Sequence, residues 1–177
     1  MRWAGVILAF CLAACDSGSS PPPPVSTPSP SPSASPTPTV ASLEASGAIP
    51  TLDRSASLSG PDTNSNGVRD DVDAYISSGD HTPEQKAGLT KFAAGIQGSL
   101  SVDPLDRDAT IGASRTVSRA LNCVLVRFGA NISAGAKAMS DIESITTNTR
   151  ARLDAYLAYN KALEGSVVAT AEGDTCE

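Results

Sequence analysis

Apolar side chains recur at helical intervals from residue 68 to residue 163 of this chain. The first group has spacings of four, three and one residues, which place its members on one face of a short helix: Val68, Val72, Tyr75 and Ile76. Gly79 is a typical residue to end this helix. A second helix begins after Thr82, because Thr82 can cap it, Pro83 suits its first turn and Gln85 completes a capping box.

The rest of the pattern predicts three further helices. Residues 106–128 carry an apolar stripe, and we expect the second half of this helix to be the most buried part of the protein. Another helix begins near Ser133, and the run 146–149 predicts a break followed by a new cap. The last helix, 149–163, directs four apolar side chains toward a core: Leu153, Tyr156, Leu157 and Leu163. The prediction is an all-α fold, a small bundle of about five helices.

The helix that begins near residue 83 contains several glycines. Gly88, Gly95 and Gly98 each lower its intrinsic helix propensity. On a helix surface, however, a residue without Cβ lets a neighbouring element approach closely. We therefore expect these glycines to lie where another helix packs.

The N-terminus has the order of a secretory signal. One positive charge, Arg2, precedes an apolar run from Trp3 to Leu12, and the chain turns polar at Asp16. A membrane-spanning helix needs about 20 apolar residues, so this run is too short to span. The signal is expected to occupy residues 1–14.

A polar segment rich in Ser, Pro, Thr and Ala follows the signal. Four consecutive prolines at 21–24 and repeated Ser-Pro or Thr-Pro steps leave too few apolar residues for a core. Proline favours extended backbone at about 3.1 Å per residue, so thirty residues reach on the order of 90 Å. We expect a disordered tether over 15–48 and one helical domain over 49–177.

The residues Leu12-Ala13-Ala14-Cys15 resemble the lipobox of bacterial lipoproteins. The resemblance implies that cleavage exposes Cys15, which carries diacylglyceryl and often a further acyl chain, typically palmitate. The protein would then be anchored in a membrane and face the periplasm or the cell exterior, with inner and outer membrane both open. The alternative is ordinary cleavage after Ala14 that leaves a free cysteine.

Charge and cysteines narrow the possible functions. The chain has 13 Lys and Arg, of which Arg2 leaves with the signal, against 19 Asp and Glu. Such an acidic body gives no support for nucleic-acid binding. Outside the cytoplasm, Cys123 and Cys176 favour a disulfide worth roughly 3 to 4 kcal/mol. The alternative, a nucleophilic Cys123, would need a base, and His81 is the only histidine.

Residues 62–73 fit the twelve-position oxygen-ligand loop of an EF-hand, with Gly67 at the sharp turn at position six. Calcium suits this donor set because it is a hard cation that takes six to eight oxygens. The candidate ligands are Asp62, Asn64, Asn66, the main-chain carbonyl of Val68, Asp70 directly or through water, and Asp73. The alternative is an Asn- and Asp-rich turn that binds no metal.

Two positions depart from the usual EF-hand loop. Asp73 closes the loop where Glu is usual, and Arg69 replaces the apolar residue that pairs two loops. With both departures the loop resembles the calcium loops of dockerins and thrombospondin type 3 repeats. The run Asn66-Gly67-Val68-Arg69-Asp70-Asp71-Val72 also resembles a group of uncharacterised bacterial secreted proteins with a small helical domain. These resemblances imply an architecture and a metal, and no activity.

Three functions fit these observations. The first is a noncatalytic, lipid-anchored calcium-binding module that binds a protein partner or organises the envelope. The second is a hydrolase that uses carboxylates such as Asp70, Asp71 and Asp73, with or without calcium. The third is a dockerin-like assembly role, although dockerins normally carry two loops and this chain has one. The partner or substrate is not evident from the sequence.

Overall fold

The structure is a computed structural model that describes residues 37–169 and 171–177. Within these residues it contains six helices and no strand, so the all-α prediction is confirmed. The signal, Cys15 and most of the expected tether lie outside them. The helices are α1 (Val40–Ala45), α2 (Asp70–Ser78), α3 (Pro83–Ser99), α4 (Arg107–Phe128), α5 (Ile132–Thr146) and α6 (Arg150–Ala162).

None of the helices in the described part of the chain is long and apolar enough to cross a membrane.

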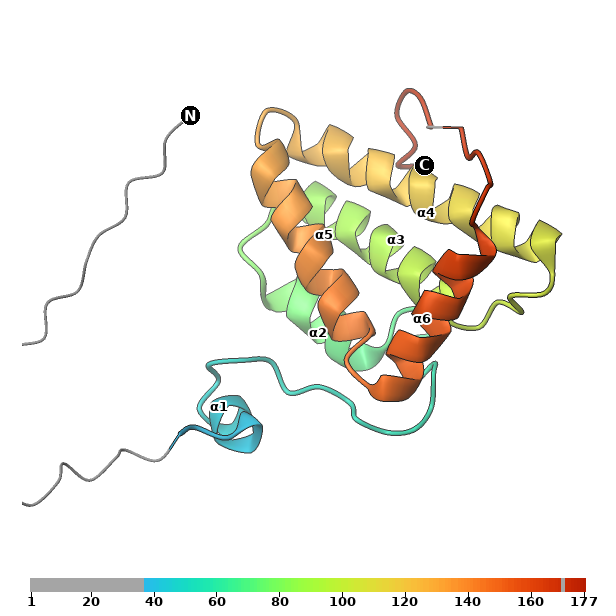
Figure 1. The fold of residues 1–177 in the computed structure, drawn as a ribbon. Coiled ribbons are helices and arrows are strands. Elements are labelled where there is room, and N and C mark those ends of the chain that lie inside the picture. The colour runs from blue at the N-terminus through green and yellow to red at the C-terminus, as the bar shows by residue number, and fades with distance from the viewer. Residues whose placement is uncertain (1–36, 170) are drawn as a thin grey trace, which may run out of the picture. The chain divides into compact units, whose positions relative to one another are not determined.

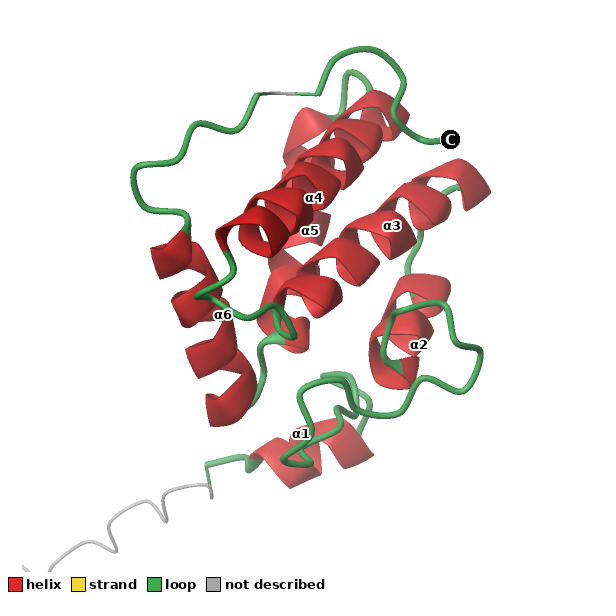
Figure 2. Cartoon of the chain, turned by 90° about the vertical axis from the view of Figure 1, so that its right-hand side faces the viewer, coloured by secondary structure: helices red, strands yellow, loops and turns green. Residues whose placement is uncertain are grey.

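The helix at the centre of the packing is α3. Both α4 and α5 pack against it, and α4 runs alongside it (Figures 1 and 2). Eight of the 17 residues of α3 are buried, against four of the 11 in the second half of α4, residues 118–128. The expectation that the second half of α4 would be the most buried part is therefore wrong, because α2, α4 and α5 all pack against α3.

Close packing of α4 was expected at three glycines of α3, and the structure shows it at two of them. A Cβ atom at Gly95 would lie 3.4 Å from Cα of Val117, and one at Gly88 would lie 3.4 Å from Sγ of Cys123. A Cβ at Gly98 would meet no atom within 4 Å, so this glycine serves no close approach.

One apolar cluster joins α2, α3, α4 and α5. It contains the predicted inner face of α2, and Val124 and Ile142 in it are fully buried. Burial of such side chains stabilises the fold by roughly 1.5 to 3 kcal/mol each. Its members are Val68, Val72, Ile76, Leu89, Phe92, Ala93, Ile96, Ala120, Val124, Phe128, Ala138 and Ile142.

The predicted helix boundaries hold where cap residues mark them. At the start of α3 the Oγ1 atom of Thr82 accepts from the main-chain N–H of Gln85 at 3.3 Å, and Oε1 of Gln85 accepts from the N–H of Thr82 at 3.1 Å. The break after Thr146 is also present, and Thr149 caps α6. These local signals are confirmed because each depends only on residues within one helical turn.

Helix α1 lies in a segment that the composition assigned to the tether. Residues 40–45 lack proline and contain good helix formers, and Thr39 caps them by accepting from the N–H of Ser42 at 3.1 Å. Glu44 accepts from the N–H of Leu52 and pairs with Arg54. The expectation of an extended tether up to residue 48 is therefore wrong for these residues.

The inner face of α6 also differs from the sequence pattern. Leu153 and Leu157 are 41% and 55% exposed. The helix instead buries Arg152 and Tyr159. The expectation that both leucines face the core is wrong, because a buried arginine determines the orientation of this helix.

A disulfide between Cys123 and Cys176 holds the C-terminal segment against α4, as the sequence predicted. Neighbouring hydrogen bonds support it: Nδ2 of Asn122 donates to the carbonyl of Gly173, and Oγ1 of Thr175 donates to the carbonyl of Arg119, both at 2.6 Å. Stable disulfides are typical of oxidising compartments outside the cytoplasm.

Candidate metal centre

Residues 62–73 form a tight loop that runs directly into α2. Its backbone turns at Ser65 and Gly67, which have φ angles of 56° and 81°. Glycine adopts such a conformation without the steric cost of a Cβ atom. The carboxylate of Asp62 closes the turn, because its two oxygens accept from the N–H groups of Asn66 at 3.1 Å and Gly67 at 2.9 Å.

Side chains at positions three, five and twelve of the loop meet at one carboxylate oxygen. The Nδ2 atoms of Asn64 and Asn66 both donate to Oδ2 of Asp73, at 3.1 and 2.8 Å. The Oδ1 atoms of the two asparagines accept from loop N–H groups, and each keeps a second lone pair. Asp62 accepts from the same N–H as Asn64, so four oxygen-bearing side chains gather here.

The side chain at position nine lies to one side of this group. Asp70 accepts from the main-chain N–H and from the hydroxyl of Thr63, at 2.8 and 2.7 Å. These hydrogen bonds, that of the hydroxyl above all, lower the pKa of Asp70. Asp70 therefore holds the start of the loop against the start of α2, and a contact with a metal would pass through water.

The donors of the loop are all oxygen atoms. Two carboxylates, Asp62 and Asp73, and two amides come together, with the main-chain carbonyl of Val68 as the expected fifth donor. Within residues 37–169 and 171–177, no three His, Cys, Asp or Glu side chains group as a metal site. Oxygen donors with two negative charges fit calcium and do not fit zinc or copper.

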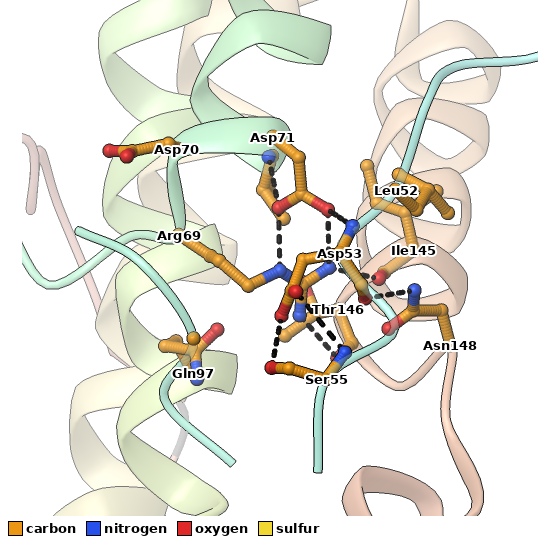
Figure 3. Close-up of polar contacts among 12 residues, drawn as sticks. Leu52, Asp53, Ser55, Arg69, Asp70, Asp71, Gln97, Ile145, Thr146 and Asn148 are labelled. Carbon is orange, nitrogen blue, oxygen red and sulfur yellow. Dashed lines mark hydrogen bonds and ion pairs between the residues drawn. The ribbon is translucent and has the colours of Figure 1, made fainter. Parts of the chain in front are cut away.

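The residue at position eight anchors the loop to the rest of the domain. The side chain of Arg69 is fully buried, and its guanidinium lies between Asp71 and the end of α5 (Figure 3). Nε and NH2 bind the two carboxylate oxygens of Asp71 at 2.5 and 3.0 Å. The guanidinium also donates to the carbonyls of Ile145 and Thr146, where a positive charge is favourable.

A second buried guanidinium lies next to the first. NH1 of Arg152 donates to the carbonyl of Asp53 at 2.7 Å and to Oδ1 of Asn148 at 2.8 Å, and NH2 pairs with the Asp53 carboxylate. The N–H of Asp53 in turn donates to Asp71 at 2.7 Å. We call Arg69, Asp71, Asp53 and Arg152 the arginine network. The guanidinium of Arg152, with Ser55, lowers the pKa of Asp53 to about 2.

From the sequence Arg69 is expected on the loop, whereas the arginine network is not evident. Arg69 and Arg152 look like ordinary surface residues in the sequence, and the partners of Arg152 at Asp53 are 99 residues away. The one local signal is Gly60, which has a φ of 64° and whose missing Cβ atom leaves room for the Arg69 side chain.

We expect Gly60→Ala to destabilise the fold by roughly 2 to 4 kcal/mol, because the new Cβ would overlap Cγ and Cδ of Arg69 in addition to straining the backbone. Gly47→Ala is the matched control, since Gly47 has a φ of 73° and no atom within 4 Å of its Cβ position. The control should cost about 1 kcal/mol in urea unfolding. Equal losses would show that Arg69 does not occupy this space.

We expect Asp53→Asn to lower the free energy of unfolding at pH 7 by on the order of 1 to 2 kcal/mol, after allowance for partial exposure. Because the folded-state pKa of Asp53 is depressed, this stability is present above the unfolded pKa near 4 and is lost as the pH falls toward 2. The difference between wild type and variant should therefore shrink as the pH falls below 4, be small at pH 2 and vanish only at lower pH.

Asp154→Asn is the control for this experiment, because Asp154 forms an exposed pair with Arg150 on the same helix. It should change stability by less than about 0.5 kcal/mol. A wild-type curve that is parallel to the Asp53→Asn curve from pH 7 to pH 2 would contradict the role of Asp53.

The geometry of residues 62–73 is the evidence for this metal centre. Comparisons of the chain with protein-family models, with curated proteins and with solved structures found no match. The donors of the loop itself are two carboxylates, two amide oxygens and a main-chain carbonyl. That donor set is typical of a site for a hard divalent cation.

Proposed function

We propose that this protein is a noncatalytic, calcium-stabilised module, anchored outside the cytoplasm by lipid on Cys15, which binds a protein or envelope partner through its helical domain. One observation supports the calcium part of this proposal. The side chains of Asn64 and Asn66 both contact the carboxylate of Asp73, beside Asp62. The disulfide supports an oxidising location.

Calcium in this loop would serve the structure of the domain. It would neutralise Asp62 and Asp73 and hold a loop in which Val68 reaches the core and Arg69 belongs to the arginine network. With two neutral amides and the short side chain of Asp73 in the donor set, we expect a weak site, at roughly 10⁻⁴ to 10⁻³ M. Such an affinity suits a calcium-rich exterior.

The hydrolase alternative receives less support from the carboxylates it would use. Asp70 is held by Thr63, and Asp71 is held by Arg69 and by the N–H of Asp53. His81 lies edge-on to Phe128, with ring centroids 5.5 Å apart. A general acid or base must be able to exchange a proton with its substrate. The hydrogen bonds and contacts of these side chains occupy the atoms that would do so. We therefore propose a binding role.

The calcium part predicts a metal-dependent melting temperature. At 10 mM calcium, about ten to a hundred times the expected dissociation constant, linkage adds roughly 1.4 to 2.7 kcal/mol and raises Tm by about 5 to 10 °C. Asp62→Ala should abolish the rise. Asp80→Asn, an exposed aspartate outside the loop, should retain it. A wild-type Tm that calcium leaves unchanged would remove the metal from this proposal.

The anchor part predicts where the protein fractionates when a bacterial host expresses the full chain. The wild type should be found with membranes and should label with radioactive palmitate, whereas Cys15→Ser should be unlabelled and soluble or uncleaved. Cys11→Ser is the control, because Cys11 lies within the apolar run and should leave labelling intact. Absence of label on the wild type would contradict the anchor.

A further inference from the structure

A pocket of about 320 Å³ opens between α4, α6 and the segment that follows α6. It shares no residue with the calcium loop. For comparison, an engineered protein cavity of about 150 Å³ holds a benzene molecule, so this pocket has room for a molecule of about two fused rings. The lining residues that matter here are Val117, Ser118, Leu121, Tyr156, Tyr159 and Leu163.

The lining of this pocket carries no charged side chain. The other pockets of the described chain segments differ, since one includes Lys91 and Arg119 and another includes Glu84 and Arg127. An uncharged, mainly apolar lining penalises an ionic ligand, because the ion would lose water without gaining a partner. The chemistry of the lining therefore favours a neutral molecule.

Two tyrosines give the pocket an aromatic wall. The rings of Tyr156 and Tyr159 are stacked, with centroids 6.4 Å apart and planes at 25°. Burial raises the pKa of both hydroxyls, so both are neutral at physiological pH. Tyr159 is only 4% exposed, and its hydroxyl has no hydrogen-bond partner among residues 37–169 and 171–177. That hydroxyl is free to bond to a molecule in the pocket.

The two helical walls of the pocket, α4 and α6, are held in place by contacts already described. Helix α4 is packed closely on α3 at Gly95, and α6 is anchored by the buried guanidinium of Arg152. A pocket whose walls do not need to be ordered on binding gives higher affinity for a small ligand. The site is therefore suited to bind without a large rearrangement.

We propose that this pocket binds a neutral, planar aromatic molecule of up to about two fused rings with one hydroxyl or carbonyl group. The ring would pack against the tyrosine wall and the apolar residues of α4, and the polar group would bond to the hydroxyl of Tyr159. The proposal does not depend on calcium, and it gives the helical domain a ligand of its own.

The direct test is a fluorescence titration of the purified full chain with 2-naphthol. We expect saturable binding of one molecule per chain. Ser118→Asp places a carboxylate in the pocket and should weaken binding at least tenfold. Ser140→Asp, the same substitution at an exposed position of α5, should leave it unchanged. Failure of the wild type to saturate, or equal binding by wild type and a folded Ser118→Asp, would overturn the proposal.

A second variant keeps the test decisive if Ser118→Asp does not fold. Tyr159→Phe removes one hydroxyl and no ring contact. It should weaken 2-naphthol about threefold to tenfold, which is the usual effect of one lost hydrogen bond, and leave naphthalene unchanged. Unchanged affinity for both molecules, or an equal loss for both, would show that the hydroxyl of Tyr159 does not receive the ligand.

Discussion

Two guanidinium groups that are fully buried must find partners, and the rest of this structure depends on that requirement. An unpaired charge in a protein interior costs several kcal/mol, so Arg69 and Arg152 are tolerable only when their carboxylates and carbonyls are all in place. Those partners come from the segment before the loop, the start of α2, the end of α5 and the turn between α5 and α6. The four regions must therefore assemble together.

This requirement also explains how the loop of residues 62–73 is held in place without a partner loop. In a paired lobe, position eight contributes an apolar residue to a short strand shared by two loops. In this chain Arg69 occupies that position and binds the terminal carbonyls of α5, which replaces the partner loop by a helix of the same domain. The neighbouring Val68 is in the core, so the loop is attached on two sides.

The features that could be predicted from the sequence are those with short-range causes. The capping box at Thr82, the break after Thr146 and the close packing at Gly95 each depend on neighbouring residues or on a missing Cβ atom. The inner face of α6 could not be predicted from the spacing of its leucines. The orientation of this helix depends on burying Arg152 beside partners up to 99 residues away in the sequence. The pattern of apolar residues along the chain does not indicate which charged side chain will be buried.

The same property of α6 connects the two proposed sites. Arg152 faces the arginine network, while Tyr156 and Tyr159, one and two turns further along, line the neutral pocket. Hydrogen bonds connect the loop to α6 through Arg69, Asp71 and Asp53. The same buried charges therefore fix the residues of the candidate ion site and the helix that carries the tyrosine wall.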